Sequence, residues 1–138
     1  MGSAIPFFGV LLAAASAFAV GGLWYSPTLF IKPWQKLVGS TDADMQKRFP
    51  TAMGLMAVGA LLSAYVLAHF ILYTERVTGA MGVSAGLQTG FWAWVGLALP
   101  TVIAGGALEP RDPMVMVMYA GNRLVTLLLM GLILGAFM

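Results

Sequence analysis

The sequence contains no cysteine, a single histidine and few charged residues. Without cysteine the chain cannot form a disulfide, use a thiolate as a nucleophile or bind a metal through sulfur. Because His69 is the only histidine, one chain cannot supply the two axial ligands of a membrane cytochrome or a two-histidine metal site. We therefore expect no metal and no cofactor. The net charge is only +2 and basic residues stand beside acids, which gives no support to nucleic-acid binding.

Long uncharged segments make up most of the chain, which is 60% hydrophobic and 9% charged. Three of them, and a fourth interrupted only by Arg123, exceed the ~20 apolar residues that cross about 30 Å of hydrocarbon. These segments are Gly2–Ile31, Phe49–Thr74, Val77–Leu108 and Met114–Met138. The first has no basic region before it and no convincing cleavage site, so we interpret it as a retained helix. The sequence predicts an all-α integral membrane protein, with residues 1–138 forming a single bundle of four transmembrane helices.

We expect the four helices to span about Pro6–Trp24, Thr51–Tyr73, Ala85–Gly106 and Met114–Phe137. Pro100 should kink the third, because proline lacks the N–H that bonds to the preceding turn. Between the first two helices, apolar residues at helical spacing predict a short amphipathic segment in the headgroup region. Gly39 would end that segment, and Thr41–Asp44 resembles a capping box for one more short helix ending near Pro50.

The distribution of basic residues predicts the orientation in the membrane. The first and third connections contain five of the six basic residues outside the predicted spans: Lys32, Lys36, Lys47, Arg48 and Arg111. The second connection contains only Arg76, and neither terminus contains any. By the positive-inside rule, the loops between helices 1 and 2 and between helices 3 and 4 are cytoplasmic, and both termini lie outside.

Small residues recur at intervals of four in each of the four apolar spans. Lipid tails are as apolar as leucine, so membrane helices associate where small residues let their backbones approach closely. The sets are Gly9, Ala13, Ala17 and Gly21; Ala60, Ala64 and Ala68; Gly82, Gly86 and Gly90; and Gly131 and Gly135. We expect close helix contacts along these faces. Because four helices enclose little volume, we favour a homo-oligomer surrounded by membrane lipids.

Arg123 is the most informative polar residue, because it lies about two to three turns inside the fourth span. A central arginine costs ~2.5–3.5 kcal/mol on translocon scales, so a partner or a water-filled cleft is expected. Helical side chains lean toward the N-terminus, here the cytoplasmic end, which directs the guanidinium toward Glu109 and the end of the first helix. The simpler interpretation is an ion pair with Glu109 or contact with helix-end carbonyls, and the alternative is anion binding. The candidate ligand-binding residues are Arg123, Asn122, Trp24, Tyr25, Ser26 and Glu109.

Residues 22–30, Gly-Leu-Trp-Tyr-Ser-Pro-Thr-Leu-Phe, resemble the opening signature of a bacterial family of small four-helix membrane proteins, the domain-of-unknown-function family 1761. The second half is similar to that family's third and fourth helices at Gly90–Gly96, Arg111 and the segment 124–134. Asn122 and Arg123 are more polar than the pair usual at their positions. The resemblance implies a four-helix fold in a bacterial cytoplasmic membrane, and it brings no reaction or substrate.

These observations leave two classes of function open. The first is a small oligomeric channel, carrier or membrane-embedded binding protein for a small solute or lipid, with its polar site at the cytoplasmic ends of helices 1, 3 and 4. The second is a membrane enzyme or accessory subunit acting on a lipid-soluble substrate, or a purely structural membrane protein. The sequence has no histidine cluster or carboxylate pair within the spans, which argues against an enzyme.

Overall fold

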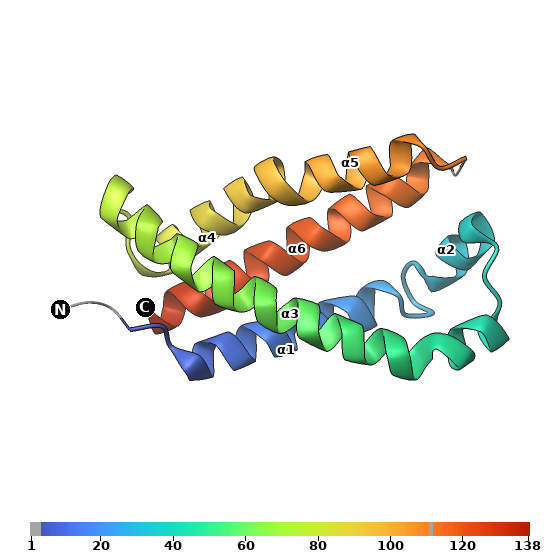
Figure 1. Ribbon diagram of the computed structural model, residues 1–138, viewed down its shortest axis with the longest axis horizontal. Helices are drawn as coiled ribbons and strands as arrows, with labels where there is room; N and C mark the ends of the chain where they lie inside the picture. Colours follow the sequence, from blue (N-terminus) through green and yellow to red (C-terminus); the bar gives the residue numbers. More distant parts are fainter. Residues whose placement is uncertain (1–3, 111) are drawn as a thin grey trace.

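The computed structural model describes residues 4–110 and 112–138, and within them it contains helices and no strands (Figure 1). In chain order the elements are α1 (Phe7–Trp24), α2 (Ile31–Val38), α3 (Asp42–Thr78), α4 (Gly82–Ala93), the π-helical turn η1 (Trp94–Ala98), α5 (Leu99–Ala107) and α6 (Pro113–Phe137). Arg111, one of the five basic residues behind the predicted orientation, lies outside the described residues.

Within the described residues, four helical segments are long and apolar enough to cross a membrane: α1, α3, the continuous segment Gly82–Ala107 and α6. The chain is therefore a multi-pass membrane protein, as the sequence predicts. In Figure 1, α6 lies between α1 and the α4–α5 segment, and α3 crosses the bundle obliquely. The start of α1 lies at the same end of the bundle as the C-terminus, whereas α2 lies at the opposite end.

The predicted boundary near Pro50 is wrong, because α3 runs through this proline as one helix of 37 residues. Pro50 lies in the exposed first part of α3, where water can bond the carbonyl that its missing N–H leaves unpaired. The predicted capping box is confirmed. The Thr41 hydroxyl accepts a hydrogen bond from the Asp44 N–H at 3.2 Å, and the Asp44 carboxylate accepts one from the Thr41 N–H at 3.1 Å.

The amphipathic segment is confirmed as α2, which ends at Gly39 with a left-handed φ of 70°. Its apolar residues Trp34, Leu37 and Val38 are half-buried, and Lys32 and Lys36 are exposed. The helix also packs against α6, to which the Trp34 indole N–H donates a hydrogen bond. Packing against α6 fixes the position of α2 relative to the bundle.

The glycines of α4 meet those of α6, which confirms the predicted close contact. A Cβ at Gly86 would contact the carbonyl group of Gly131, and a Cβ at Gly90 would lie 2.5 Å from the Leu127 carbonyl oxygen. Similarly, a Cβ at Gly135 would lie 2.8 Å from the carbonyl carbon of Gly82. The two backbones touch along this line, so van der Waals contact between main chains is what holds the last two spans together.

The third span is irregular just before Pro100, where the sequence predicts a kink. The Leu99 N–H bonds to the Trp94 carbonyl, five residues earlier, in the π-helical turn η1. The Trp94 indole N–H donates to the Ala120 carbonyl of α6 at 2.8 Å, which attaches this turn to the centre of the bundle. Widened turns of this kind re-aim the side chains on either side of them.

Candidate binding site

One face of α6 carries a stripe of polar side chains within an otherwise apolar helix. Tyr119, Asn122, Arg123 and Thr126 follow the spacing i, i+3, i+4 and i+7, which places them on one side of a helix. Thr126 is buried, Tyr119 and Asn122 are half-buried and Arg123 is exposed. The stripe turns toward α1 and α3, because all four side chains line one cavity there.

This cavity, which we call the Arg123 cavity, has a volume of about 540 Å³ and lies between α1, α3 and α6. Its polar lining consists of Tyr25, Ser63, Tyr119, Asn122, Arg123 and Thr126. The rest of its wall is apolar, with Phe18 on α1, Met56 on α3 and Met130 on α6. A mostly apolar hollow with a few convergent polar groups has the character of a small-molecule site.

Arg123 lies well inside α6, the last of the helices long and apolar enough to cross a membrane. It lies ten residues after Pro113, or about 15 Å along the axis, where the hydrocarbon layer is about 30 Å thick. Arg123 and Glu109 line different cavities, and no described carboxylate forms an ion pair with the guanidinium. The predicted Arg123–Glu109 ion pair is thus not seen among the described residues. Glu109 instead lines a cavity of about 210 Å³ between α5 and the start of α6, with Asp112 and Tyr119.

Tyr25, which follows the last residue of α1, lines the same cavity as Arg123. Burial raises the pKa of the Tyr25 phenol to about 12, and the nearby Tyr119 adds to this effect while the positive charge of Arg123 opposes it. The phenol is consequently neutral at physiological pH. Tyr25 can donate a hydrogen bond to a ligand, and it does not neutralise the guanidinium.

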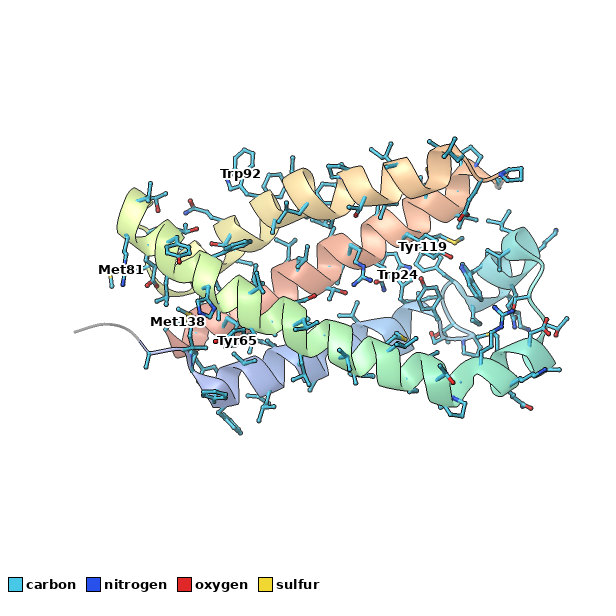
Figure 2. The ribbon with its side chains drawn as sticks, in the orientation of Figure 1. Trp24, Tyr65, Met81, Trp92, Tyr119 and Met138 are labelled. Atoms are coloured by element: carbon cyan, nitrogen blue, oxygen red, sulfur yellow. The ribbon has the colours of Figure 1, made fainter. Side chains whose placement is uncertain are left out.

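Aromatic side chains close the cavity at the end where α2 lies. The Trp34 indole N–H donates to the Tyr119 hydroxyl at 3.2 Å, and the Trp34 ring meets the Tyr25 ring edge-on with centroids 5.7 Å apart. Figure 2 shows Tyr119 and Trp24 at this same end of the bundle, whereas Met81 and Met138 lie at the other end. Tyr25 and Tyr119, which line the cavity, therefore form its aromatic rim, and Trp34 contacts both.

The structure thus brings together three of the six predicted site residues, Arg123, Asn122 and Tyr25. Trp24 packs behind them: its ring covers Gly121 of α6, where an added Cβ would lie 3.0 Å away. The buried Trp24 indole nitrogen has no hydrogen-bond partner among the described residues. Ser26 lies in the turn after α1, where its hydroxyl bonds that of Thr28 at 2.8 Å.

Sequence reasoning missed Tyr119, Thr126 and Ser63. The first two were detectable, because their spacing from Arg123 on α6 is that of one helix face. Ser63 was not, since a single serine in an apolar helix carries no pattern and only the crossing of α3 over α6 brings it to the cavity.

A second hollow adjoins the Arg123 cavity between α3, η1, α5 and α6. Its volume is about 360 Å³, and it shares Ser63, Val102, Arg123 and Leu127 with the first. Apart from Ser63, Thr101 and Arg123, its lining is apolar. Arg123 therefore lies where the two hollows meet.

Comparison with known families gives one match that covers residues 8–135, to the family described as "Protein of unknown function (DUF1761)". The chain belongs to this family. Membership agrees with the resemblance seen in the sequence and with the membrane-spanning helices of the structure. No curated protein and no solved structure matches the chain.

Proposed function

We propose that this protein is a membrane-embedded binding protein for a small organic anion, whose carboxylate or phosphate group is held by Arg123. The proposal depends on one observation: an arginine at hydrocarbon depth is exposed to a cavity and forms no ion pair with a described carboxylate. An arginine held there without a partner is costly. A bound anion would supply the missing charge.

The surroundings of Arg123 favour an oxyanion as the ligand. A guanidinium binds carboxylate and phosphate oxygens with two parallel hydrogen bonds. Tyr25, Tyr119 and Asn122 line the same cavity and provide neutral donors for the remaining oxygens. No carboxylate occurs among the described lining residues, so nothing there repels an anion or acts as a catalytic base. This composition favours binding over catalysis.

The size of the cavity suits a small molecule, since about 540 Å³ falls within the roughly 300–1,000 Å³ of ligand pockets. Exposed Lys32, Lys36, Lys47 and Arg48 surround the same end of the bundle as the aromatic rim. By the positive-inside rule we propose that this end faces the cytoplasm of a bacterium, from which the anion would enter. Outward-facing glycines such as Gly54, with nothing within 4 Å of an added Cβ, suit close approach of a second copy in a homo-oligomer.

The test is thermal unfolding of the purified protein in neutral detergent, titrated with inorganic phosphate and with acetate. We expect at least one anion to raise the melting temperature in a saturable way, since a ligand that binds only the folded state stabilises it. Arg123→Gln should weaken this binding by about 10- to 150-fold, as expected for losing hydrogen bonds to a charged group worth about 1.5–3 kcal/mol.

Arg76→Gln is the matched control, because Arg76 is an exposed arginine at the opposite end of α3. It should leave the titration unchanged. Equal stabilisation of the wild type and Arg123→Gln by every anion, or no stabilisation of either, would refute the proposal. Arg123→Lys should retain part of the affinity, because lysine keeps the charge and loses the two-point geometry.

A further inference from the structure

The apolar hollow beside Arg123 lies between two helical walls, and we call it the α3–α5 groove. On α3 its wall is made by residues at the spacing i, i+3, i+4 and i+7, which is one helix face: Ser63, Val66, Leu67 and Phe70. The opposite wall consists of Ala93, Leu97, Ala98, Thr101 and Val102 of α4, η1 and α5. The hollow, of about 360 Å³, therefore has one face of α3 on one side and the α4–α5 segment on the other.

The polar groups of the groove are gathered at its Arg123 end. From Ser63 the α3 wall continues for seven residues, or about 10 Å, to Phe70 and carries only apolar side chains. Thr101 on the other wall donates its hydroxyl to the carbonyls of Ala98 and Leu97 at 2.7 and 3.1 Å, so this donor is used within its own helix. Beyond Arg123 the groove therefore suits a hydrocarbon chain.

The groove is open on its lipid side. Val66, Phe70 and Leu97 are 45%, 38% and 58% exposed, although they line a hollow of the bundle. The small side chains of Ala93 and Ala98 leave space where larger residues would bring the two walls into contact. An acyl chain can enter sideways from the membrane without unfolding any helix.

Building on the proposed anion site, we infer that the ligand is a single-chain amphiphile, with its carboxylate or phosphate on Arg123 and its acyl chain in the α3–α5 groove. The groove extends from Arg123 away from the end that carries α2. With that end in the cytoplasm, the headgroup lies on the cytoplasmic side of the tail, and the tail extends from the depth of Arg123 toward the opposite face of the membrane. A lipid of the cytoplasmic leaflet has this orientation before it binds.

The experiment is photolabelling in phosphatidylcholine vesicles with a fatty acid that carries a diazirine in its chain. Peptide mapping should find the label concentrated on Val66, Phe70 and Leu97, in excess over the lipid-facing control Leu62, which is 61% exposed. Arg123→Gln should reduce the groove label by at least about tenfold, because it removes the charged anchor of the headgroup. Label spread equally over Leu62 and the groove, or unchanged by Arg123→Gln, would overturn the inference.

Two variants separate the chain site from the anion site. Ala98→Phe fills the groove and should abolish the groove label, whereas Ala104→Phe places the same side chain on α5 outside the groove and should leave it intact. Stabilisation by phosphate or acetate should survive both. If the small anions bind through Arg123 but the groove stays unlabelled, the ligand is a soluble anion and only this inference fails. If neither small anions nor the fatty acid depend on Arg123, the proposed function fails as well.

Discussion

Replacing Gly86 by alanine should lower the stability of the bundle by an amount that can be estimated from the contacts of the added Cβ. A Cβ added there would meet the carbonyl group of Gly131, with the carbonyl carbon at 2.7 Å, and the Cα of Gly135 at 3.2 Å, whereas ordinary contacts begin at 3.4 Å. These neighbours are backbone atoms of α6, so they cannot rotate away as a side chain does. Gly86→Ala therefore requires α4 and α6 to separate.

Overpacking of this kind costs about 1–3 kcal/mol, and we expect the upper half of that range because the neighbours are rigid. Against this stands the better helix propensity of alanine, about 1 kcal/mol. Gly54→Ala is the control, since nothing lies within 4 Å of its added Cβ and only the propensity gain applies. The propensity gain is common to both variants, so they should differ by the overpacking cost of about 2–3 kcal/mol, or roughly 5–15 °C in melting temperature by the scaling of soluble domains.

The assay is thermal unfolding in one detergent, with the whole series measured side by side. Gly90→Ala should approach Gly86→Ala, because its Cβ would lie 2.5 Å from a backbone oxygen. Gly9→Ala should cost less, since its nearest neighbour is the Phe137 side chain at 3.2 Å, which can move. Equal melting temperatures for Gly86→Ala and Gly54→Ala would show that the α4–α6 contact is not as close as described and would refute the reasoning.

Three further predictions concern the connections and the rim. A cysteine at Thr78 should react with an impermeant maleimide on intact cells and one at Ser40 should not; the reverse pattern would contradict the proposed orientation. Thr41→Ala removes the cap of α3 and should cost about 1 kcal/mol, seen as faster amide exchange in its first turn, whereas Thr41→Ser should restore protection. Trp34→Phe and Tyr119→Phe should each lower the free energy of unfolding by about 0.5–1.5 kcal/mol, because each removes the hydrogen bond that the two residues share. The double variant should lose no more than one single variant does. Additive losses would refute this hydrogen bond as the common cause.

Features of the fold that depend on local chemistry were predictable from the sequence. The hydropathy of the four spans, the stop at Gly39 and the capping box at Thr41 each follow from a few neighbouring residues, and each is present. The end predicted at Pro50 was not correct, because a proline near an exposed helix end costs less than one in the hydrocarbon. The energetic cost of a proline in a helix depends on whether water surrounds it, and the neighbouring sequence does not show this.

The site was predictable in part. Its residues on α6 follow one another at helical spacing in the sequence, whereas its other walls come from distant parts of the chain. Arg123 and Asn122 could be singled out as polar residues within a span, and Tyr119 and Thr126 could have been added from their spacing. The predicted partner Glu109 was chosen because the arginine side chain leans toward the N-terminus of its helix. Helix direction alone could not show that α1 and α3 cover this face of α6 and that Glu109 belongs to the far side of Tyr119, in a different cavity.

The position of the glycine contact explains why a space exists beside Arg123. α4 and α6 approach closely at the end with Gly86 and Gly131, whereas toward α2 the face of α6 that lines the cavity carries Tyr119, Asn122 and Arg123. Large side chains hold the neighbouring helices apart there, and η1 turns the third span at the boundary between the two regions. One half of α6 thus packs tightly against α4, and the other half lines the cavity and carries Arg123. A stable scaffold with an open, charged hollow is what binding within a membrane requires, because the packing energy of one half offsets the cost of keeping the other half open.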